Sequence, residues 1–129
     1  MNQQRYTIGK TAEKAGLTVH TLRYYEKEGL LPFVERTESG LRSFAVEDLE
    51  WLNLINCLKN TGMPIKQIKQ FIDLCTEGDC TLEKRLEIFE TQKENLLSQM
   101  EKLAGYMKTI EHKIEYYEKA IRTKQDKKD

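Results

Sequence analysis

The sequence predicts a mainly α-helical protein with a small first domain and a long helix after it. Three observations support this prediction: two short helical segments around a glycine turn, a turn-rich stretch at residues 33–44, and a heptad pattern from Leu82 to Ile121. We expect a domain over residues 1–76, and a coiled-coil dimerisation helix with a charged tail over residues 77–129.

The first two helices are marked by capping residues. Thr7 can cap a helix that Gly16 ends, and Thr18 can cap a second helix that Gly29 ends. Two short helices joined by a tight turn form the helix-turn-helix pattern.

A hairpin and two further helices are expected next. Residues 33–44 hold the turn signal Glu38-Ser39-Gly40 between two short segments. Helical spacing returns from Val46 to about Asn60, and a helix beginning near Pro64 follows. The two helices have apolar faces made by Leu49, Leu52, Ile55 and Leu58, and by Ile65, Ile68, Phe71, Ile72 and Cys75.

The heptad pattern is the strongest signal in the second half of the chain. Apolar residues recur in alternating steps of four and three, and only Lys93 interrupts them. Forty helical residues span about 60 Å, which is more than the first domain can cover. We therefore expect a homodimer with contacts through Leu96, Met100, Leu103, Met107, Ile110 and Ile114.

Composition excludes several classes of protein. Lys and Arg number 21 and Asp and Glu number 21, so a nucleic-acid site must come from local arrangement. We expect no membrane partner, because no apolar run approaches ~20 residues and the first residues lack a secretory signal. An odd count of three cysteines favours the reducing cytoplasm.

An enzyme and a bound cofactor are not expected, because no nucleophile–base pair or glycine-rich phosphate loop is present.

The helix after Thr18 has two different faces. Leu22 and Tyr25 point toward the first helix, and the opposite face carries groups that can reach phosphates or base edges: His20, Arg23, Tyr24 and Lys27. The alternative is an ordinary solvated face, which Glu26 and Glu28 favour. The helix-turn-helix context favours DNA.

These segments resemble the MerR family of bacterial transcriptional regulators. The resemblance covers roughly residues 5–75 and includes LRYYE-x-x-GL-x-P, G-x-R-x-F and TGM-x-I-x-x-I in that order. It implies a winged helix-turn-helix fold and an antiparallel coiled coil. It also implies binding to a palindromic promoter operator and distortion of the promoter spacer so that RNA polymerase can engage.

The resemblance assigns DNA contacts by position. Arg23 and Tyr24 would lie in or beside the major groove, and Arg42 in the wing would contact backbone or minor groove. Lys66, near a helix start, would hold phosphate. The expected DNA-binding residues are His20, Thr21, Arg23, Tyr24, Lys27, Arg42, Phe44 and Lys66. Phe44 stands where tyrosine is common in the family, and it lacks the hydroxyl with which a tyrosine could bind phosphate.

The cysteines are candidates for sensing a signal. Cys57 matches the cysteine position of the aldehyde- and thiol-stress branch, and its alternative role is a small apolar filler. Cys80 lies near a helix start, which favours thiolate, and its alternative is a tolerated surface residue. Cys75 is expected in the core. Cys75 and Cys80 leave open a metal-responsive regulator, but one chain offers no four-ligand zinc site.

Two further expectations concern the end of the sequence and a rival function. The sequence ends with the heptad region, so we expect no C-terminal ligand-binding domain. The rival to a DNA-binding regulator is a coiled-coil adaptor without specific DNA binding, which would leave LRYYE and the wing without a purpose.

Overall fold

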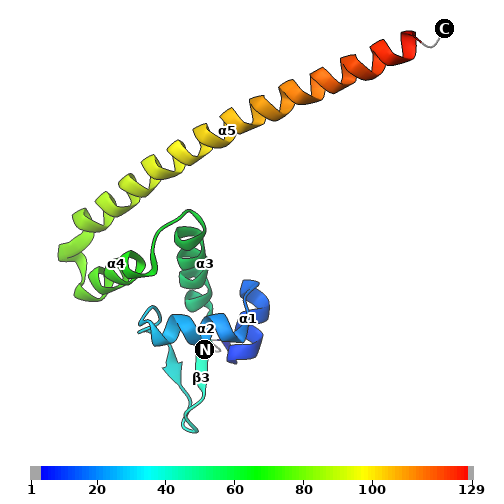
Figure 1. Cartoon of the computed structure of the whole chain (residues 1–129). Coiled ribbons are helices and arrows are strands. Elements are labelled where there is room, and N and C mark those ends of the chain that lie inside the picture. Colours follow the sequence, from blue (N-terminus) through cyan, green and yellow to red (C-terminus); the bar gives the residue numbers. More distant parts are fainter. Residues whose placement is uncertain (1–3, 128–129) are drawn as a thin grey trace. The chain divides into compact units, whose positions relative to one another are not determined.

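The structure is a computed structural model that describes residues 4–127. Its elements are β1 (Arg5–Tyr6), α1 (Ile8–Ala15), α2 (Val19–Lys27), β2 (Glu35–Arg36), β3 (Arg42–Ala45), α3 (Val46–Asn60), α4 (Ile65–Glu77), the 3₁₀ turn η1 (Asp79–Thr81) and α5 (Leu82–Asp126) (Figure 1). The mainly helical fold with a wing and a long last helix is confirmed. The chain forms two units, residues 1–92 and 93–129, which are described separately.

The expected caps delimit the first two helices. The Thr7 side chain accepts a hydrogen bond from the Lys10 amide at 3.1 Å, and Gly16 closes α1 with φ 69°. Thr18 likewise accepts from the Thr21 amide at 3.0 Å at the start of α2. These hydrogen bonds satisfy amides that the helices leave unpaired, so each helix begins at a defined residue.

The wing is part of a small antiparallel sheet in the order β1-β3-β2. The expected hairpin is formed by β2 and β3, which pair Glu35 with Ser43. Strand β1, which the sequence did not predict, pairs Tyr6 with Phe44 along the other edge of β3. This pairing joins the chain's beginning to the base of the wing.

The core of the first unit joins α1 to α4 and the first turns of α5. Its fully buried side chains include Tyr25, Phe44, Leu22, Leu30, Leu52, Ile55, Leu58, Ile68 and Ile72. The Phe89 ring of α5 meets Phe71 of α4 edge to face, with centroids 5.1 Å apart. The compact unit therefore extends to Gln92, beyond the domain end expected near residue 76.

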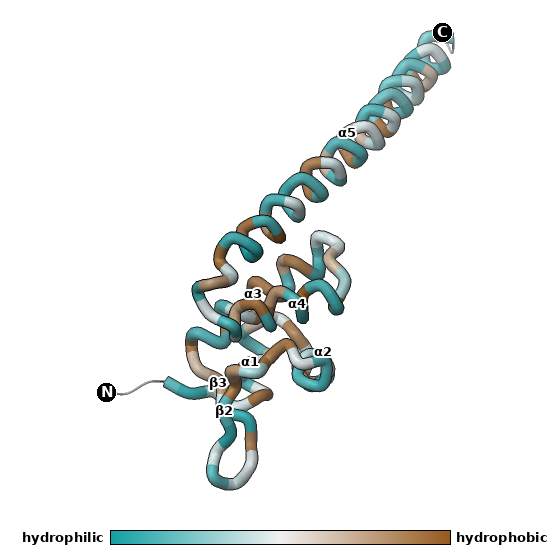
Figure 2. The backbone as a smooth tube through the Cα atoms, turned by 90° about the vertical axis from the view of Figure 1, so that its left-hand side faces the viewer, coloured by the Kyte–Doolittle hydropathy of each residue, from teal (hydrophilic) through white to brown (hydrophobic). Residues whose placement is uncertain are grey.

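The second unit is the remainder of α5. None of the described α5 residues is buried. Hydrophobic residues recur along the helix, as the brown segments of the tube in Figure 2 show. The expected dimer residues Leu96, Met100, Leu103, Met107, Ile110 and Ile114 are all exposed in the single chain. No helix among residues 4–127 combines the length and apolar character needed to cross a membrane.

Candidate nucleic-acid interface

Helix α2 has the two faces that its sequence predicts. Leu22 and Tyr25 are fully buried, and the Tyr25 hydroxyl donates to the Asn56 side-chain oxygen of α3 at 2.9 Å. These contacts fix the rotation of α2 about its axis. The side chains left exposed are His20, Arg23, Tyr24 and Lys27.

Thr21 lies at the edge of this face. It is half-buried, its amide donates to Thr18, and its hydroxyl lies 2.9 Å from the Thr18 hydroxyl. Thr21 therefore helps to form the N-terminal cap of α2, next to the exposed side chain of His20.

Glu26 connects α2 to the wing. Both carboxylate oxygens of Glu26 are engaged by Arg42, through the arginine Nε and Nη2 atoms. Arg36 Nη2 lies 3.5 Å from the same carboxylate. The Arg42 side chain is only 19% exposed, so its guanidinium is committed to this contact and presents a small surface to solvent.

Arg36 and Leu41 of the wing, which the sequence did not single out, are more accessible than Arg42. The Arg36 side chain is 57% exposed and donates to the Gly40 carbonyl at 3.0 Å. Leu41 at the wing turn is 67% exposed. An arginine and a nearby apolar side chain on an exposed turn are groups that proteins use in the minor groove. Arg36 could have been recognised as a candidate DNA contact, because it is a basic residue within the predicted hairpin.

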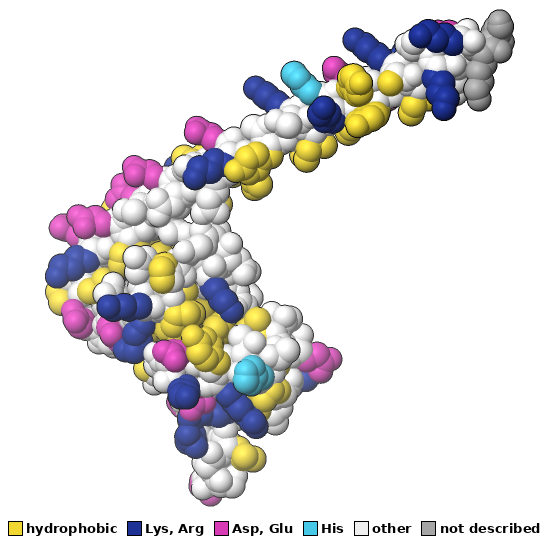
Figure 3. Space-filling model, viewed as in Figure 1, with side chains coloured by type: hydrophobic (Ala, Val, Ile, Leu, Met, Phe, Trp, Pro, Cys, Tyr) yellow, Lys and Arg dark blue, Asp and Glu magenta, His cyan; other side chains and the backbone are white. Residues whose placement is uncertain are grey.

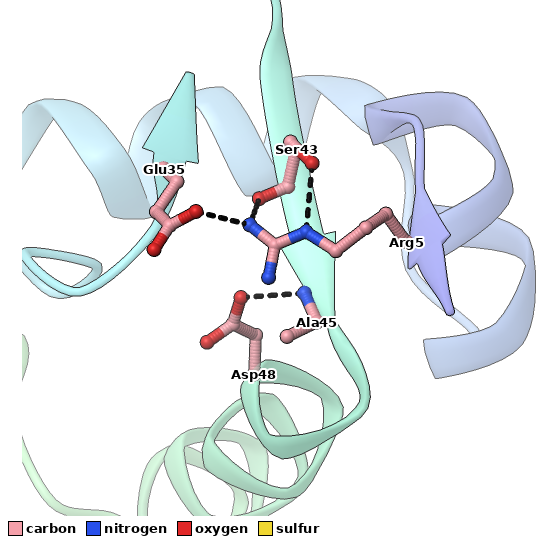
Figure 4. Close-up of polar contacts among 5 residues, drawn as sticks. All are labelled: Arg5, Glu35, Ser43, Ala45 and Asp48. Atoms are coloured by element: carbon pink, nitrogen blue, oxygen red, sulfur yellow. Dashed lines mark hydrogen bonds and ion pairs between the residues drawn. The ribbon is translucent and has the colours of Figure 1, made fainter. Parts of the chain in front are cut away.

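A second polar cluster holds the other side of the wing (Figure 4). Arg5 of β1 donates to the Ser43 hydroxyl at 3.0 Å and to the Glu35 carboxylate at 2.9 Å. Below it, the Asp48 carboxylate accepts from the Ala45 amide at 2.7 Å. Burial raises the pKa of Asp48 above its usual range, against the lowering effect of that hydrogen bond.

The predicted DNA contact of Phe44 is wrong. Phe44 is 1% exposed and packs in the core beneath the wing, because β3 directs alternate side chains to opposite faces. Its ring anchors the wing to the helices and is not available to a ligand.

The start of α4 is close to the end of α2. Gly29, the residue after the end cap of α2, has φ 78° and packs closely against α4. A Cβ added to Gly29 would lie 2.5 Å from the Lys69 side chain. Lys66, in the first turn of α4, is exposed. Figure 3 shows Lys and Arg side chains gathered where α2 meets the wing. Local arrangement therefore gives this electroneutral chain a basic surface.

Comparison with known families shows to which family the chain belongs. A family model described as "MerR HTH family regulatory protein" matches residues 6–75, and one described as "MerR, DNA binding" matches residues 49–113. The chain belongs to the MerR family. It is a MerR-type transcriptional regulator, as the resemblance in its sequence implies.

Individual relatives of this MerR-family chain extend the comparison. It is 50% identical over 115 residues to an uncharacterised HTH-type transcriptional regulator of Haemophilus influenzae, covering 89% of this chain and 85% of that one. It is 41% identical over 90 residues to the HTH-type transcriptional regulator AdhR of Bacillus subtilis, covering 70% of this chain and 64% of AdhR.

A solved structure is similar along most of the chain. It is the crystal structure of HiNmlR, a MerR family regulator lacking the sensor domain, bound to promoter DNA. It is 49% identical, covers 91% of this chain and 93% of its own, and has a TM-score of 0.86.

The cysteines of this MerR-family chain lie in different environments. Cys57 is exposed on α3, as its position away from the Leu52–Ile55 face predicts. One to two turns earlier, Glu50, Trp51 and Leu54 line a shallow pocket of about 280 Å³. Cys57 is accessible to a small reagent because it is itself exposed.

The other two cysteines are less suited than Cys57 to react with a small reagent. Cys80 is exposed, but it lies in the η1 turn before α5, with its sulfur 3.9 Å from the Glu77 carbonyl oxygen. Cys75 is half-buried, and burial raises the pKa of its thiol against the lowering effect of Arg85. Among residues 4–127, no group of three or more His, Cys, Asp or Glu side chains could hold a metal ion.

Proposed function

We propose that this regulator binds promoter DNA as a homodimer, with α2 in the major groove and the wing beside it. The observation that carries the proposal is the pair of faces on α2. One face is fixed by buried Leu22 and Tyr25, and the other presents donors and cations to solvent. The similar structure of HiNmlR, which is bound to promoter DNA, supports this proposal.

Each exposed side chain has a proposed role. Arg23 and His20 reach base edges in the major groove, while Lys27 and the Tyr24 hydroxyl contact phosphates. Lys66 contributes a phosphate contact from the start of α4. In the wing, Arg36 joins Arg42 as a candidate for backbone or minor-groove contact. Thr21 supports the Thr18 cap at the start of α2, next to His20.

The dimer is proposed from the exposed apolar stripe of α5. A stripe with heptad spacing and no cover in the single chain is the pattern that coiled coils bury. The resemblance to the family favours an antiparallel pair, which places two α2 helices about a two-fold axis on a palindromic operator. Distortion of the spacer would then align the promoter for RNA polymerase.

For the signal, we propose an aldehyde or another electrophile that reacts with Cys57. With formaldehyde, the thiolate sulfur would form a bond to the carbonyl carbon, and the carbonyl oxygen would take up a proton, giving a hydroxymethyl thioether. The similarity to AdhR is consistent with this branch of the family. Cys80 is the second candidate, because it too is exposed.

Hydrogen bonds connect Cys57 to other elements of the first unit. The Thr61 hydroxyl donates to the Cys57 carbonyl at 2.8 Å, and the Gln92 amide of α5 donates to the Thr61 hydroxyl at 2.8 Å and its carbonyl at 3.1 Å. These hydrogen bonds link the last turn of α3 to α5 at the turn that precedes α4.

Fluorescence anisotropy tests the proposal. The protein is titrated onto its own promoter region and onto a scrambled duplex of equal length, with and without formaldehyde. We expect specific binding that changes with formaldehyde in the wild type and does not change in Cys57→Ser. Equal weak affinity for both duplexes would favour the adaptor. Specific binding without a thiol-dependent change would remove the electrophile signal and retain the regulator.

A further inference from the structure

Glu26 has no evident place on a DNA-binding helix. It lies on α2 between Tyr24 and Lys27, on the side of the helix that faces the wing. A carboxylate near DNA repels phosphates, so by charge alone Glu26 weakens binding to every duplex. A different role is needed to explain the residue.

The contacts of Glu26 indicate that role. The Nε and Nη2 atoms of Arg42 face the two carboxylate oxygens of Glu26, so the two opposite charges form a close ion pair. The side chains of Glu26 and Arg42 are only 26% and 19% exposed, so water screens this pair less than a fully exposed one. Arg36, 3.5 Å from the same carboxylate and far more exposed, keeps most of its surface free for another ligand.

Side-chain contacts with β1 and α2 hold the two strands of the wing hairpin. Strand β2 consists of two exposed residues, Glu35–Arg36, and so short a ribbon is marginally stable alone. On the β1 side, Arg5 holds Glu35 and Ser43. On the α2 side, Glu26 holds both strands of the hairpin, because Arg36 belongs to β2 and Arg42 to β3.

We propose that Glu26 is a positioning residue for DNA recognition. It holds the wing at the angle to α2 at which both elements meet one duplex, and it acts through Arg42. Arg36 is the wing cation that reaches the DNA. The inference rests on the proposed DNA-binding function and adds to it a residue whose charge opposes the ligand it helps to bind.

The test compares Glu26→Gln with Glu28→Gln, by anisotropy on the promoter duplex and on the scrambled duplex. Glu28 is the matched control, because it is an exposed carboxylate two residues away at the end of α2. If charge alone matters, both variants bind both duplexes more tightly. If Glu26 positions the wing, Glu26→Gln loses about fivefold to tenfold in promoter affinity, the range for a shielded charge pair, while its scrambled-duplex affinity stays equal or rises.

A second pair of variants keeps the test valid if Glu26→Gln fails to fold. Arg42→Lys retains the positive charge but cannot span both carboxylate oxygens. It should lose promoter affinity several-fold, whereas Arg122→Lys, which makes the same exchange at an exposed α5 position outside the proposed DNA interface, should retain it. In a double-mutant cycle, Arg42→Lys should cost less in the Glu26→Gln background than in the wild type.

The outcomes separate the two proposals. A wild type that does not distinguish promoter from scrambled duplex refutes the proposed function itself. A wild type that does distinguish them, with Glu26→Gln behaving like Glu28→Gln, overturns only the positioning role. Equal affinities of Arg42→Lys and wild type for the promoter also overturn that role.

Discussion

Leu103→Glu should dissociate the proposed dimer. Leu103 lies near the middle of the α5 stripe and is 64% exposed in the single chain, so about two thirds of its surface is available for burial by a partner. Burying a leucine contributes about 2 kcal/mol, and a two-fold dimer contains the position twice. The substitution therefore removes roughly 4 kcal/mol, before the further cost of placing two carboxylates in an apolar seam.

This loss predicts a large change in self-association. Roughly 4 kcal/mol raises the dimer dissociation constant by about a thousandfold, which moves a nanomolar dimer into the micromolar range. Sedimentation equilibrium across that concentration range measures the change. Ser98→Glu is the matched control, because it adds the same charge to an exposed α5 position outside the stripe and should leave the dimer intact. A Leu103→Glu protein that remains dimeric at nanomolar concentration would refute the assignment of the seam.

Three further predictions follow from the first unit. Arg23→Ala should reduce promoter affinity by about fivefold to a hundredfold, the value of a bidentate base contact at about 1–3 kcal/mol, with dimerisation unchanged by sedimentation. Arg122→Ala on α5 is its control, and an unchanged affinity of Arg23→Ala would contradict the placement of α2. Cys57→Ser should abolish the formaldehyde response in a reporter strain while Cys80→Ser keeps it, and the reverse pattern would move the sensor to the η1 turn. Tyr25→Phe should lower the free energy of unfolding in urea by about 1 kcal/mol, because its hydroxyl loses a hydrogen bond to α3; a variant as stable as the wild type would show that this bond contributes nothing.

Local chemistry made the helices predictable. A threonine that caps a helix and a glycine that ends it act within a few residues, so Thr18 and Gly16 mark real boundaries. The burial of Leu22 and Tyr25 follows from helical periodicity in the same way. Heptad spacing likewise predicts the stripe on α5, although its cover lies outside a single chain.

Features that depend on distant residues were not predictable. Strand β1 is two residues long and exists because it pairs with β3, about forty residues later. Phe44 fell in a motif associated with DNA contact, yet the pleat of β3 turns its ring into the core. The partnership of Glu26 with Arg42 depends on how the wing folds back on α2, which no spacing in the sequence reveals.

Hydroxyl-radical footprinting on the protein's own promoter region tests the central claim most directly. A dimer that places one α2 helix in each of two major grooves should protect two patches related by a two-fold axis, about one helical turn apart. Arg23→Ala should lose both patches together at concentrations where the wild type protects them. Protection without two-fold symmetry, or protection that survives Arg23→Ala, would contradict the account.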